Sequence, residues 1–344
     1  MSLIGLYPCS NVSAPKELSI TSASLCSVLS VTAITGNILV LLAVVIDPNR
    51  NLRSPFNFLV ANLAAADLIV GCFALPMSVE FYIRESLDNT AILITDRDHA
   101  RRIGYFISCT ASLLGLAALT VDRFIAITYP MKYRAKLSPT RTAIVSACLW
   151  TCSIAFPFLY LRVGYLKYQF VFANTAVVAT FTVLCFTYAK VFKSFKSEVQ
   201  QWDSLNGSSK ENLVKMRALE WEKKVTKTFL IMLTLFISCF LPSLILIYII
   251  SFCGQCGCIF IHWGRDLNYI LIMANSSMNP FVFAWRLRTY RRAFAKILTC
   301  GTLVEKIQFL SDLSFTWKGQ YDVSMNSLGH TASSTLPTPN YTAS

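Results

Sequence analysis

Arg123 is the residue whose type and position most need a chemical explanation. It follows an apolar run, Ile103 to Leu119, and Asp122 directly precedes it. A guanidinium at the end of a membrane-length helix is costly and needs either a partner or a route to water. Asp122 offers a partner. The alternative is that Arg123 extends its long side chain to the membrane surface beside a solvated acid.

A second group of polar side chains lies deep inside apolar segments. Asp67 follows the run Leu63-Ala64-Ala65-Ala66, and a carboxylate at that depth must face other helices and find donors or a cation. Hydroxyl and amide residues in other segments are assigned to the same site: Ser112, Asn275, Ser276 and Asn279. One acid with several neutral oxygens suits a hard monovalent cation such as sodium. The alternative is a neutral Asp67 in a structural hydrogen-bond network.

These residues would be positioned by helices that cross a membrane. The chain of 344 residues is 54% hydrophobic and only 14% charged, whereas soluble domains carry about 25% charged residues. Apolar stretches near bilayer length must form helices, because lipid offers the backbone no hydrogen-bond partner. The predicted spans are Leu25–Ile46, Phe56–Ile83, Ile103–Tyr129, Thr142–Leu161, Tyr168–Phe192, Val225–Phe252 and Leu267–Trp285. An all-α, seven-transmembrane helix bundle follows, with a short amphipathic eighth helix, Leu287–Leu298, at the inner membrane face.

The distribution of cations predicts the orientation. Most of the 31 Lys and Arg residues fall in alternate loops and the tail, which places the N-terminus outside and the C-terminus inside. The expected organisation is an extracellular segment (1–24), a membrane domain with its interfacial helix (25–299) and a disordered cytoplasmic tail (300–344). Met1–Ser24 lacks the pattern of a signal peptide, so the first helix is expected to target this multi-pass chain to the plasma membrane.

Some surface residues could be modified. Asn11-Val12-Ser13 is a glycosylation sequon on the outer side. Cys300 follows the interfacial helix and fits a palmitoylated thiol, although an unmodified cysteine fits equally well. Three cysteines, Cys253, Cys256 and Cys258, crowd the last outer loop, where a disulfide is permitted but its pairing cannot be deduced. A zinc site completed by His262 is the other alternative there.

The order and spacing of several motifs resemble those of the rhodopsin-like (class A) G-protein-coupled receptors. They are Gly36-Asn37, Leu63-Ala64-Ala65-Ala66-Asp67, Asp122-Arg123-Phe124 with Pro130-Met131, Trp150, Tyr188, Phe236 to Pro242, and Asn279-Pro280-Phe281-Val282-Phe283. Each is weak alone, but together they cover most of the chain. The resemblance implies a receptor that binds an extracellular ligand and activates heterotrimeric G proteins when helix six moves outward.

The resemblance gives Arg123 the role of a switch. At rest it would pair with Asp122 and reach Glu222 at the inner end of helix six; on activation it would meet the G protein. A solvated Glu222 is the alternative. Met131 resembles the inner-loop residue that inserts into the G protein. Phe236, Phe240 and Pro242 resemble the toggle region, with Phe240 in place of the usual Trp.

Helix seven departs from the family pattern at one position of its motif. Asn279 and Pro280 match, but Phe283 replaces the usual Tyr, which removes a water-mediated link to Tyr188 expected in the active state. Losing such a bond costs about 1 kcal/mol and shifts the equilibrium without abolishing it.

The chain resembles the melanocortin, lysophospholipid and cannabinoid receptors in three respects. It lacks the usual outer disulfide, its loop after helix four is very short, and helix five lacks the usual proline. Other motifs are closer to adenosine receptors. A lipid, nucleoside or small peptide ligand is expected. An amine is disfavoured because its anchoring acid would fall at Tyr105, and retinal because Leu267–Trp285 contains no lysine. Of the melanocortin acid positions, Asp98 matches but Met77 and Arg102 do not.

The resemblance also places a ligand pocket between the helices. The residues expected to line it are Glu80, Tyr105, Cys109, Phe172, Ser243, Ile247 and Met273. Glu80, Asp96 and Asp98 could attract a basic group, but nearby arginines neutralise much of that field.

The remaining expectations concern partners and competing classes. Basic inner segments would meet anionic membrane lipid. The Ser- and Thr-rich tail would be phosphorylated by a receptor kinase and bound by arrestin. A transporter or channel that uses Asp67 and Arg123 in an ion path is the alternative function, but the sequence shows no internal repeat of the kind typical of transporters. No enzyme motif occurs, and the three histidines lie outside the predicted spans. No nucleic acid is expected to bind.

Overall fold

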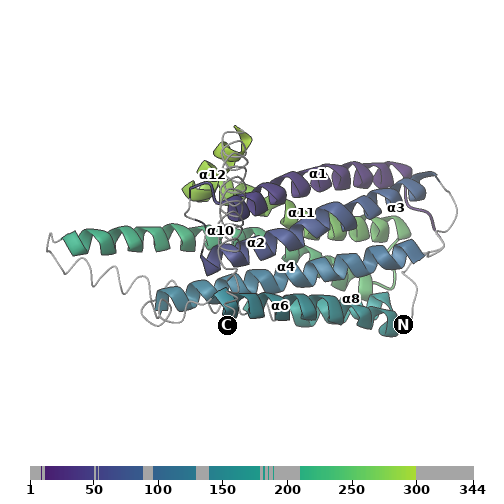
Figure 1. Ribbon diagram of the computed structural model, residues 1–344. Helices are drawn as coiled ribbons and strands as arrows, with labels where there is room; N and C mark the ends of the chain where they lie inside the picture. Colours follow the sequence, from purple (N-terminus) through teal and green to yellow (C-terminus); the bar gives the residue numbers. More distant parts are fainter. Residues whose placement is uncertain are drawn as a thin grey trace, which may run out of the picture. The chain divides into compact units, whose positions relative to one another are not determined.

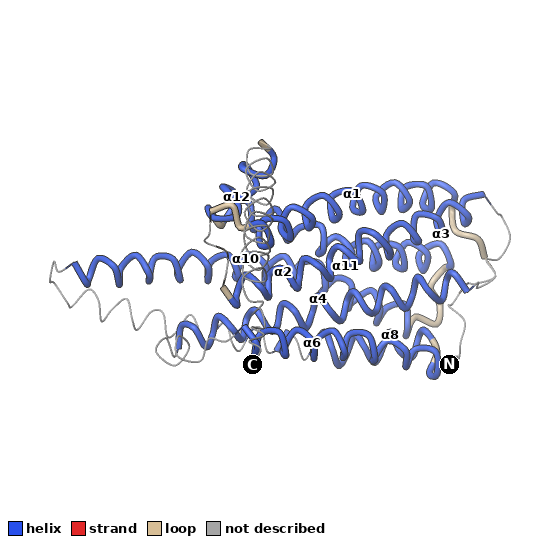
Figure 2. The backbone as a smooth tube through the Cα atoms, in the orientation of Figure 1, coloured by secondary structure: helices blue, strands red, loops and turns tan. Residues whose placement is uncertain are grey.

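The computed structural model describes residues 9, 12–49, 52, 54–87, 96–128, 139–178, 181–182, 185, 189 and 210–299. The regular elements within these residues are all helices, and none of these residues is in a strand (Figures 1 and 2). The chain divides into two compact units, Met1–Phe294 and Ala295–Ser344, and the helix bundle belongs to the first. The ends of the bundle are named outer and inner according to the orientation predicted from the sequence.

The described helices follow one another in the order of the predicted spans. They are α1 (Lys16–Ile46), α2 (Pro55–Ile69), α3 (Leu75–Leu87), α4 (Asp96–Thr128), α6 (Pro139–Ala155), α7 (Tyr160–Val163), α8 (Tyr165–Phe172), α10 (Lys210–Phe252), α11 (Cys258–Arg286) and α12 (Arg288–Leu298). Shorter elements continue them. The π-helix η1 (Val70–Ala74) joins α2 to α3, the 3₁₀ helix η2 (Phe156–Leu159) joins α6 to α7, and the π-helix η3 (Ala173–Val177) follows α8.

Five of the described helices are long and apolar enough to cross a membrane: Lys16–Ile46, Pro55–Leu87, Arg97–Ala126, Thr140–Val163 and Thr234–Phe252. These correspond to predicted spans one to four and six. α11 covers the seventh but carries many buried polar side chains. The fifth span, Tyr168–Phe192, is described without a break only as far as Val178 and at four single positions beyond it. α1 begins at Lys16, before the predicted span, because its outer turns bury serines in polar contacts with other helices.

The bundle is built around α1, α3, α10 and α11. α1 packs against both α3 and α11, α10 packs along α11, and α2 packs against α4 (Figure 1). The approach of α1 to α11 depends on Gly36, since a Cβ there would lie only 2.8 Å from Cβ of Pro280. Any larger residue at this position would force the two helices apart.

The π-helix η1 follows Asp67 by three residues and inserts a wider turn between α2 and α3. Such turns are frequent at functional sites, because they rotate the side chains beyond them around the helix axis. Ser30 of α1 donates to the carbonyl oxygen of Gly71 at 2.8 Å and thereby fastens this irregular turn to α1. The turn separates the inner group of polar residues around Asp67 from the charged outer end of α3.

Candidate functional site

The buried carboxylate of Asp67 receives donors from two other helices. Its side chain is 0% exposed. Ser112 of α4 donates to Oδ1 at 2.9 Å, and Asn279 of α11 donates to Oδ2 at 2.7 Å. The side chain of Ser276 faces the same carboxylate. The structure therefore brings together Asp67, Ser112, Ser276 and Asn279 from three helices, as the sequence predicted.

Asn37 of α1 extends this polar group. Its amide nitrogen donates to the carbonyl oxygens of Ala33 at 2.9 Å and Ser276 at 3.2 Å. Its Oδ1 atom is buried without a protein hydrogen-bond partner, and buried polar atoms seldom lack one. Asn275, the remaining predicted member, is buried on α11 next to Ser276. The cluster therefore offers one carboxylate, several neutral oxygens and one unused carbonyl-type oxygen.

Arg123 is paired with Asp122 at the inner end of α4. Its Nη2 lies 2.6 Å from Asp122 Oδ2, and its Nε donates to the same oxygen at 3.1 Å. The guanidinium also lies over the ring of Phe56 of α2, with Cζ 4.3 Å from the ring centroid. The residue is 6% exposed. This ion pair and cation–π contact hold the guanidinium among the helices of the bundle.

A hydroxyl group from α12 enters the same region. Tyr290 is 0% exposed and donates to Asn57 Oδ1 at 2.9 Å. Its ring stacks on Phe283 of α11 at a centroid distance of 5.5 Å. Asn57 in turn donates to Ser54, the residue that caps the start of α2. The sequence did not lead us to predict a role for Tyr290, although its spacing from Phe283 can be read directly from the sequence.

The structure describes no side-chain position for five of the predicted site residues. Glu222 belongs to α10, but only its backbone is described. Four others lie outside the described residues: Tyr188, Met131, Asn11 and Cys300.

The middle of α10 contains two stacked aromatic rings followed by a proline. Phe236 and Phe240 lie one turn apart and stack with their centroids 4.3 Å apart. Pro242 stands inside the helix and cannot donate to the carbonyl of Ser238. Ser243 donates to Cys239 O at 2.8 Å, so the hydroxyl supplies a hydrogen bond close to the break. The toggle residues predicted from the sequence thus lie together at the weak point of α10.

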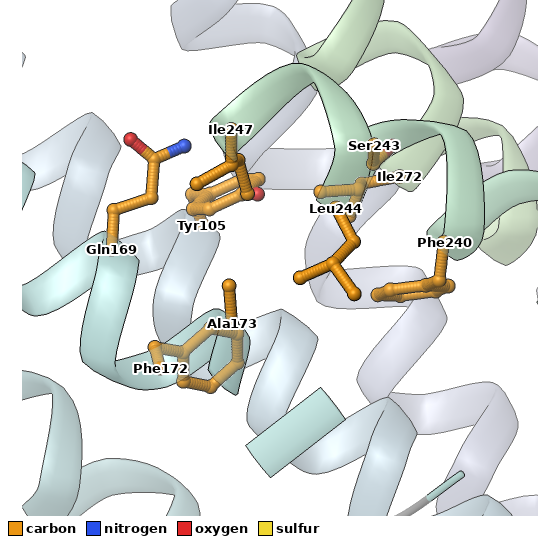
Figure 3. Close-up of a pocket in the computed structure, with 9 residues that line it drawn as sticks. All are labelled: Tyr105, Gln169, Phe172, Ala173, Phe240, Ser243, Leu244, Ile247 and Ile272. Atoms are coloured by element: carbon orange, nitrogen blue, oxygen red, sulfur yellow. The ribbon is translucent and has the colours of Figure 1, made fainter. Parts of the chain in front are cut away.

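A cavity of about 10 Å³, partly open to solvent, adjoins this point. Its walls come from α4, α8, η3, α10 and α11 (Figure 3). The lining residues are Tyr105, Gln169, Phe172, Ala173, Phe240, Ser243, Leu244, Ile247 and Ile272. Most are apolar, so the lining favours apolar groups with a few polar contacts.

Four of the expected pocket residues line this cavity: Tyr105, Phe172, Ser243 and Ile247. Cys109 and Met273 are buried close by in the sequence of the lining helices but are not in the wall. Glu80 is placed differently, because it pairs with Arg84 at 2.8 Å and with Arg97 at 3.2 Å. Gln169 was missed, although a polar residue in an apolar segment is the same signal that identified Asp67.

The outer end of the bundle is tied by a buried charge network that sequence reasoning also missed. Arg265 of α11 contacts both carboxylate oxygens of Glu85 at 2.7 and 2.8 Å and Asp266 at 2.6 Å. Two serines of α1 complete it: Ser19 donates to Glu85 at 2.9 Å and Ser22 to Asp266 at 3.0 Å. The network therefore joins α1, α3 and α11.

Two disulfides close the outer loop after α10. Cys253 pairs with Cys256, and Cys258 pairs with Cys9 of the N-terminal segment. The zinc alternative is therefore wrong, since all three loop cysteines are oxidised and cannot act as thiolate ligands. His262 instead contacts the carbonyl oxygen of Val12 at 2.9 Å. Cys9 was missed because nothing in its local sequence points to a partner so far along the chain.

Residues 36–166 and 161–283 match the family model described as "7 transmembrane receptor (rhodopsin family)". The chain belongs to this family. The match spans most of the chain and confirms the all-α seven-transmembrane bundle and the rhodopsin-like class A assignment. The protein is a membrane receptor of the G-protein-coupled class, and it is not an enzyme.

Curated relatives in this family differ in the ligands that their names give. The chain is 29% identical to melanocortin receptor 5 of Rattus norvegicus, over 79% of this chain and 82% of the relative. It is 28% identical to adenosine receptor A2a of Homo sapiens, over 82% and 73% respectively. It is also 28% identical to the histamine H2 receptor of Canis lupus familiaris, over 82% and 80%. Such similar levels of identity do not distinguish one ligand class from another.

Proposed function

We propose that this receptor lies in the plasma membrane with its N-terminus outside, binds an extracellular ligand in the described cavity, and activates heterotrimeric G proteins through outward movement of the inner half of α10. The position of Phe240 carries this proposal. Its ring lines the cavity and stacks on Phe236 one turn further inward. A ligand that displaces Phe240 therefore changes the packing of α10 at Pro242.

The inner end of the bundle supplies the response. Arg123 rests on Asp122 and Phe56. Movement of α10 would open the space beside this arginine and let it contact a G protein. A ligand shifts the population between the two states only by its difference in affinity for them. Glu222, Tyr188 and Met131 take part in this proposal through the roles that the family resemblance gives them.

A sodium ion beside Asp67 is part of the proposal. Each carboxylate oxygen already accepts one hydrogen bond but keeps further lone pairs. The orphaned Oδ1 of Asn37 adds a neutral oxygen at the edge of the cluster. Ser112, Asn275, Ser276 and Asn279 complete a set of hard oxygen donors with a single negative charge, which suits a monovalent cation. The ion would hold α2, α4 and α11 together in the resting state.

The lining of the cavity supports a lipid, nucleoside or small peptide ligand. Tyr105 stands in the wall where an amine would need an acid, and α11 has no lysine for a retinal Schiff base. Arrestin, a receptor kinase and anionic lipid are proposed as further partners of the inner face and tail.

Nucleotide exchange tests this function. Purified receptor in lipid nanodiscs is mixed with one heterotrimer from each G-protein family, and binding of a non-hydrolysable GTP analogue is followed. Arg123→Ala should reduce the exchange rate at least tenfold. Arg141→Ala removes an exposed cation from the start of α6 and should leave it unchanged. Folded receptor that stimulates no heterotrimer, or equal losses in both variants, would overturn the proposal.

A further inference from the structure

We propose that the outer end of the cavity binds the anionic head, a carboxylate or a phosphate, of an amphiphilic ligand, and that Arg102 and Arg101 hold this head. The inference rests on the proposed ligand cavity and specifies the class of its ligand.

Four described acids at the outer end of the bundle have cationic partners. Asp98 pairs with Arg84 at 3.0 Å, and Glu80 pairs with Arg84 and Arg97. Two more of these acids, Glu85 and Asp266, share Arg265. These four carboxylates are therefore less available to a cationic ligand.

Arg101 and Arg102 differ from these arginines. In the part of the chain that the structure describes, no carboxylate lies within salt-bridge distance of either guanidinium. Both Nε atoms are also buried without a hydrogen-bond acceptor, as is the Nε atom of Arg84, so the absence of a carboxylate partner is what sets the two apart. Each guanidinium lies over an aromatic ring instead, Arg101 over Phe81 and Arg102 over Tyr165, at 4.3 Å in both cases. A cation–π contact leaves the planar donors in the guanidinium edge without acceptors.

The neighbouring charges indicate which of the two arginines contributes more to binding of the anionic head. The group formed by Arg265, Glu85 and Asp266 carries one excess negative charge. Arg265 and Arg101 approach the same ring of Phe81, at 5.5 and 4.3 Å, so this excess partly compensates Arg101. Arg102 lies on Tyr165, on the side of α4 that faces α8. It is therefore the principal anchor, and Arg101 is the second contact.

Helix spacing places both arginines directly outward of the cavity. Tyr105 lines the cavity and follows Arg102 by three residues and Arg101 by four, so all three share one face of α4. Tyr105 also stacks on Tyr269, which Arg101 approaches at 5.9 Å. Tyr165, the ring under Arg102, is one turn outward of Gln169, another lining residue. The cations are thus about one helical turn, roughly 5 Å, beyond the cavity wall.

The two halves of this arrangement match an amphiphile. The cavity wall is mostly apolar, so it matches the apolar body of an amphiphile in chemical character. A half-buried guanidinium without an acceptor is costly, and its fork fits a carboxylate or phosphate with two parallel hydrogen bonds. An anionic head would therefore supply the acceptors that Arg102 and Arg101 lack.

The test uses thermal stability of the full chain in phosphatidylcholine nanodiscs, measured against four probes with the same alkyl chain. Dodecyl phosphate and dodecanoate carry the proposed heads, whereas dodecanol is neutral and dodecyltrimethylammonium is cationic. At least one anionic probe should stabilise the wild type saturably, and the neutral and cationic probes should not. A preference between the two anions identifies the head as phosphate or carboxylate. Equal stabilisation by dodecanol, or by the cation, would overturn the proposal.

Matched variants locate the effect. Arg102→Gln should weaken binding of the anionic probe at least tenfold and Arg101→Gln about threefold or more, from the loss of one charge-assisted contact. Arg97→Gln removes the same charge from a side chain that is 71% exposed and should change binding less than twofold. Equal effects of all three would contradict a specific site. If Arg102→Gln does not fold, Arg102→Lys is used instead, because it keeps the charge but removes the guanidinium. Unchanged binding of the anionic probe to Arg102→Lys would contradict recognition by the guanidinium fork.

Nucleotide exchange on G proteins is measured on the same nanodiscs. The proposal of an anionic ligand and the proposal of G-protein coupling can then be contradicted independently of each other. Basal nucleotide exchange without any anion preference would overturn the anionic ligand alone. Anion binding that depends on Arg102 without exchange on any G protein would overturn the proposed coupling alone.

Discussion

Tyr290 and Phe283 form a buried stacked pair whose single hydroxyl lies on α12 and not on α11. Their ring centroids are 5.5 Å apart, and the Tyr290 hydroxyl reaches Asn57 of α2 at 2.9 Å. Asn57 is adjacent to Phe56, the ring that supports Arg123. The hydroxyl missing from Phe283 thus has a counterpart one helix later, and it connects α12 to the residues around the switch arginine.

Tyr290→Phe should therefore destabilise the resting state. The substitution keeps the ring stack but leaves the buried Oδ1 of Asn57 without its donor, which costs about 1–3 kcal/mol. We expect a lower thermal midpoint and a several-fold rise in basal nucleotide exchange. Tyr168→Phe is the control, because Tyr168 is 7% exposed and stacks on Phe172 without a described hydrogen bond of its hydroxyl. Equal behaviour of the two variants would show that the Asn57 bond does not restrain the receptor.

Asp67→Asn should abolish the response of the receptor to sodium. The amide is nearly the same size and can still accept from Ser112, but it carries no charge for a cation. In the wild type, replacing potassium with sodium at ten times its dissociation constant should stabilise the folded state by about 1.4 kcal/mol. Thermal midpoints in the two salts give this difference directly. A sodium response that survives in Asp67→Asn would exclude the proposed ion site.

The grouping of polar residues around Asp67 was predictable from the sequence, because a polar side chain in an apolar membrane-length helix must face other helices. Asp67, Ser112 and Asn279 meet for this reason. The walls of the cavity were less predictable. Gln169 and Leu244 face it through the rotation of α8 and α10 about their axes, which depends on packing between helices. Contacts between distant segments, such as Cys9 with Cys258 or Arg265 with Glu85, leave no local pattern at all.

Arg265→Met should be strongly destabilising. Glu85 and Asp266 are 4% and 1% exposed, and removal of their shared cation leaves two buried carboxylates uncompensated. Breaking a buried ion pair from one side costs about 3–5 kcal/mol. Arg97→Met removes an exposed partner of Glu80 and should cost less than about 1 kcal/mol. Surface expression and thermal midpoints of the two variants distinguish these outcomes. If the triple variant Arg265→Met with Glu85→Gln and Asp266→Asn were no more stable than Arg265→Met, uncompensated charge would not be the cause.

Cys9→Ser should destabilise the outer end more than Cys253→Ser. The Cys9–Cys258 bond joins residues 249 positions apart, whereas Cys253 and Cys256 are only 3 apart. A crosslink that closes a longer loop restricts the unfolded chain more, and typical disulfides contribute about 2–4 kcal/mol. Peptide mapping without reduction would verify the pairing, and thermal midpoints would rank the variants. A larger loss in Cys253→Ser would contradict the argument from loop length.

His262 should make the stability of the outer end depend on pH. Burial lowers its pKa below the usual 6.5, and the nearby Arg265 adds to this effect, while the Val12 carbonyl, Glu85 and Asp266 oppose it. The folded state then binds fewer protons than the unfolded state when the pH falls below about 6.5, so stability decreases as the pH falls. The slope cannot exceed one proton, about 1.4 kcal/mol per pH unit.

His262→Gln removes this titration and keeps a side chain that can donate to Val12. Thermal midpoints of the wild type and the variant should therefore run parallel above pH 7 and diverge between pH 6.5 and 5, with the wild type losing stability faster. The difference between the two curves cancels the titration of Asp266 and the other acids that both proteins share. Curves that stay parallel throughout this range would show that His262 titrates alike in the folded and unfolded states, and that its burial against the N-terminal segment carries no cost for its charge.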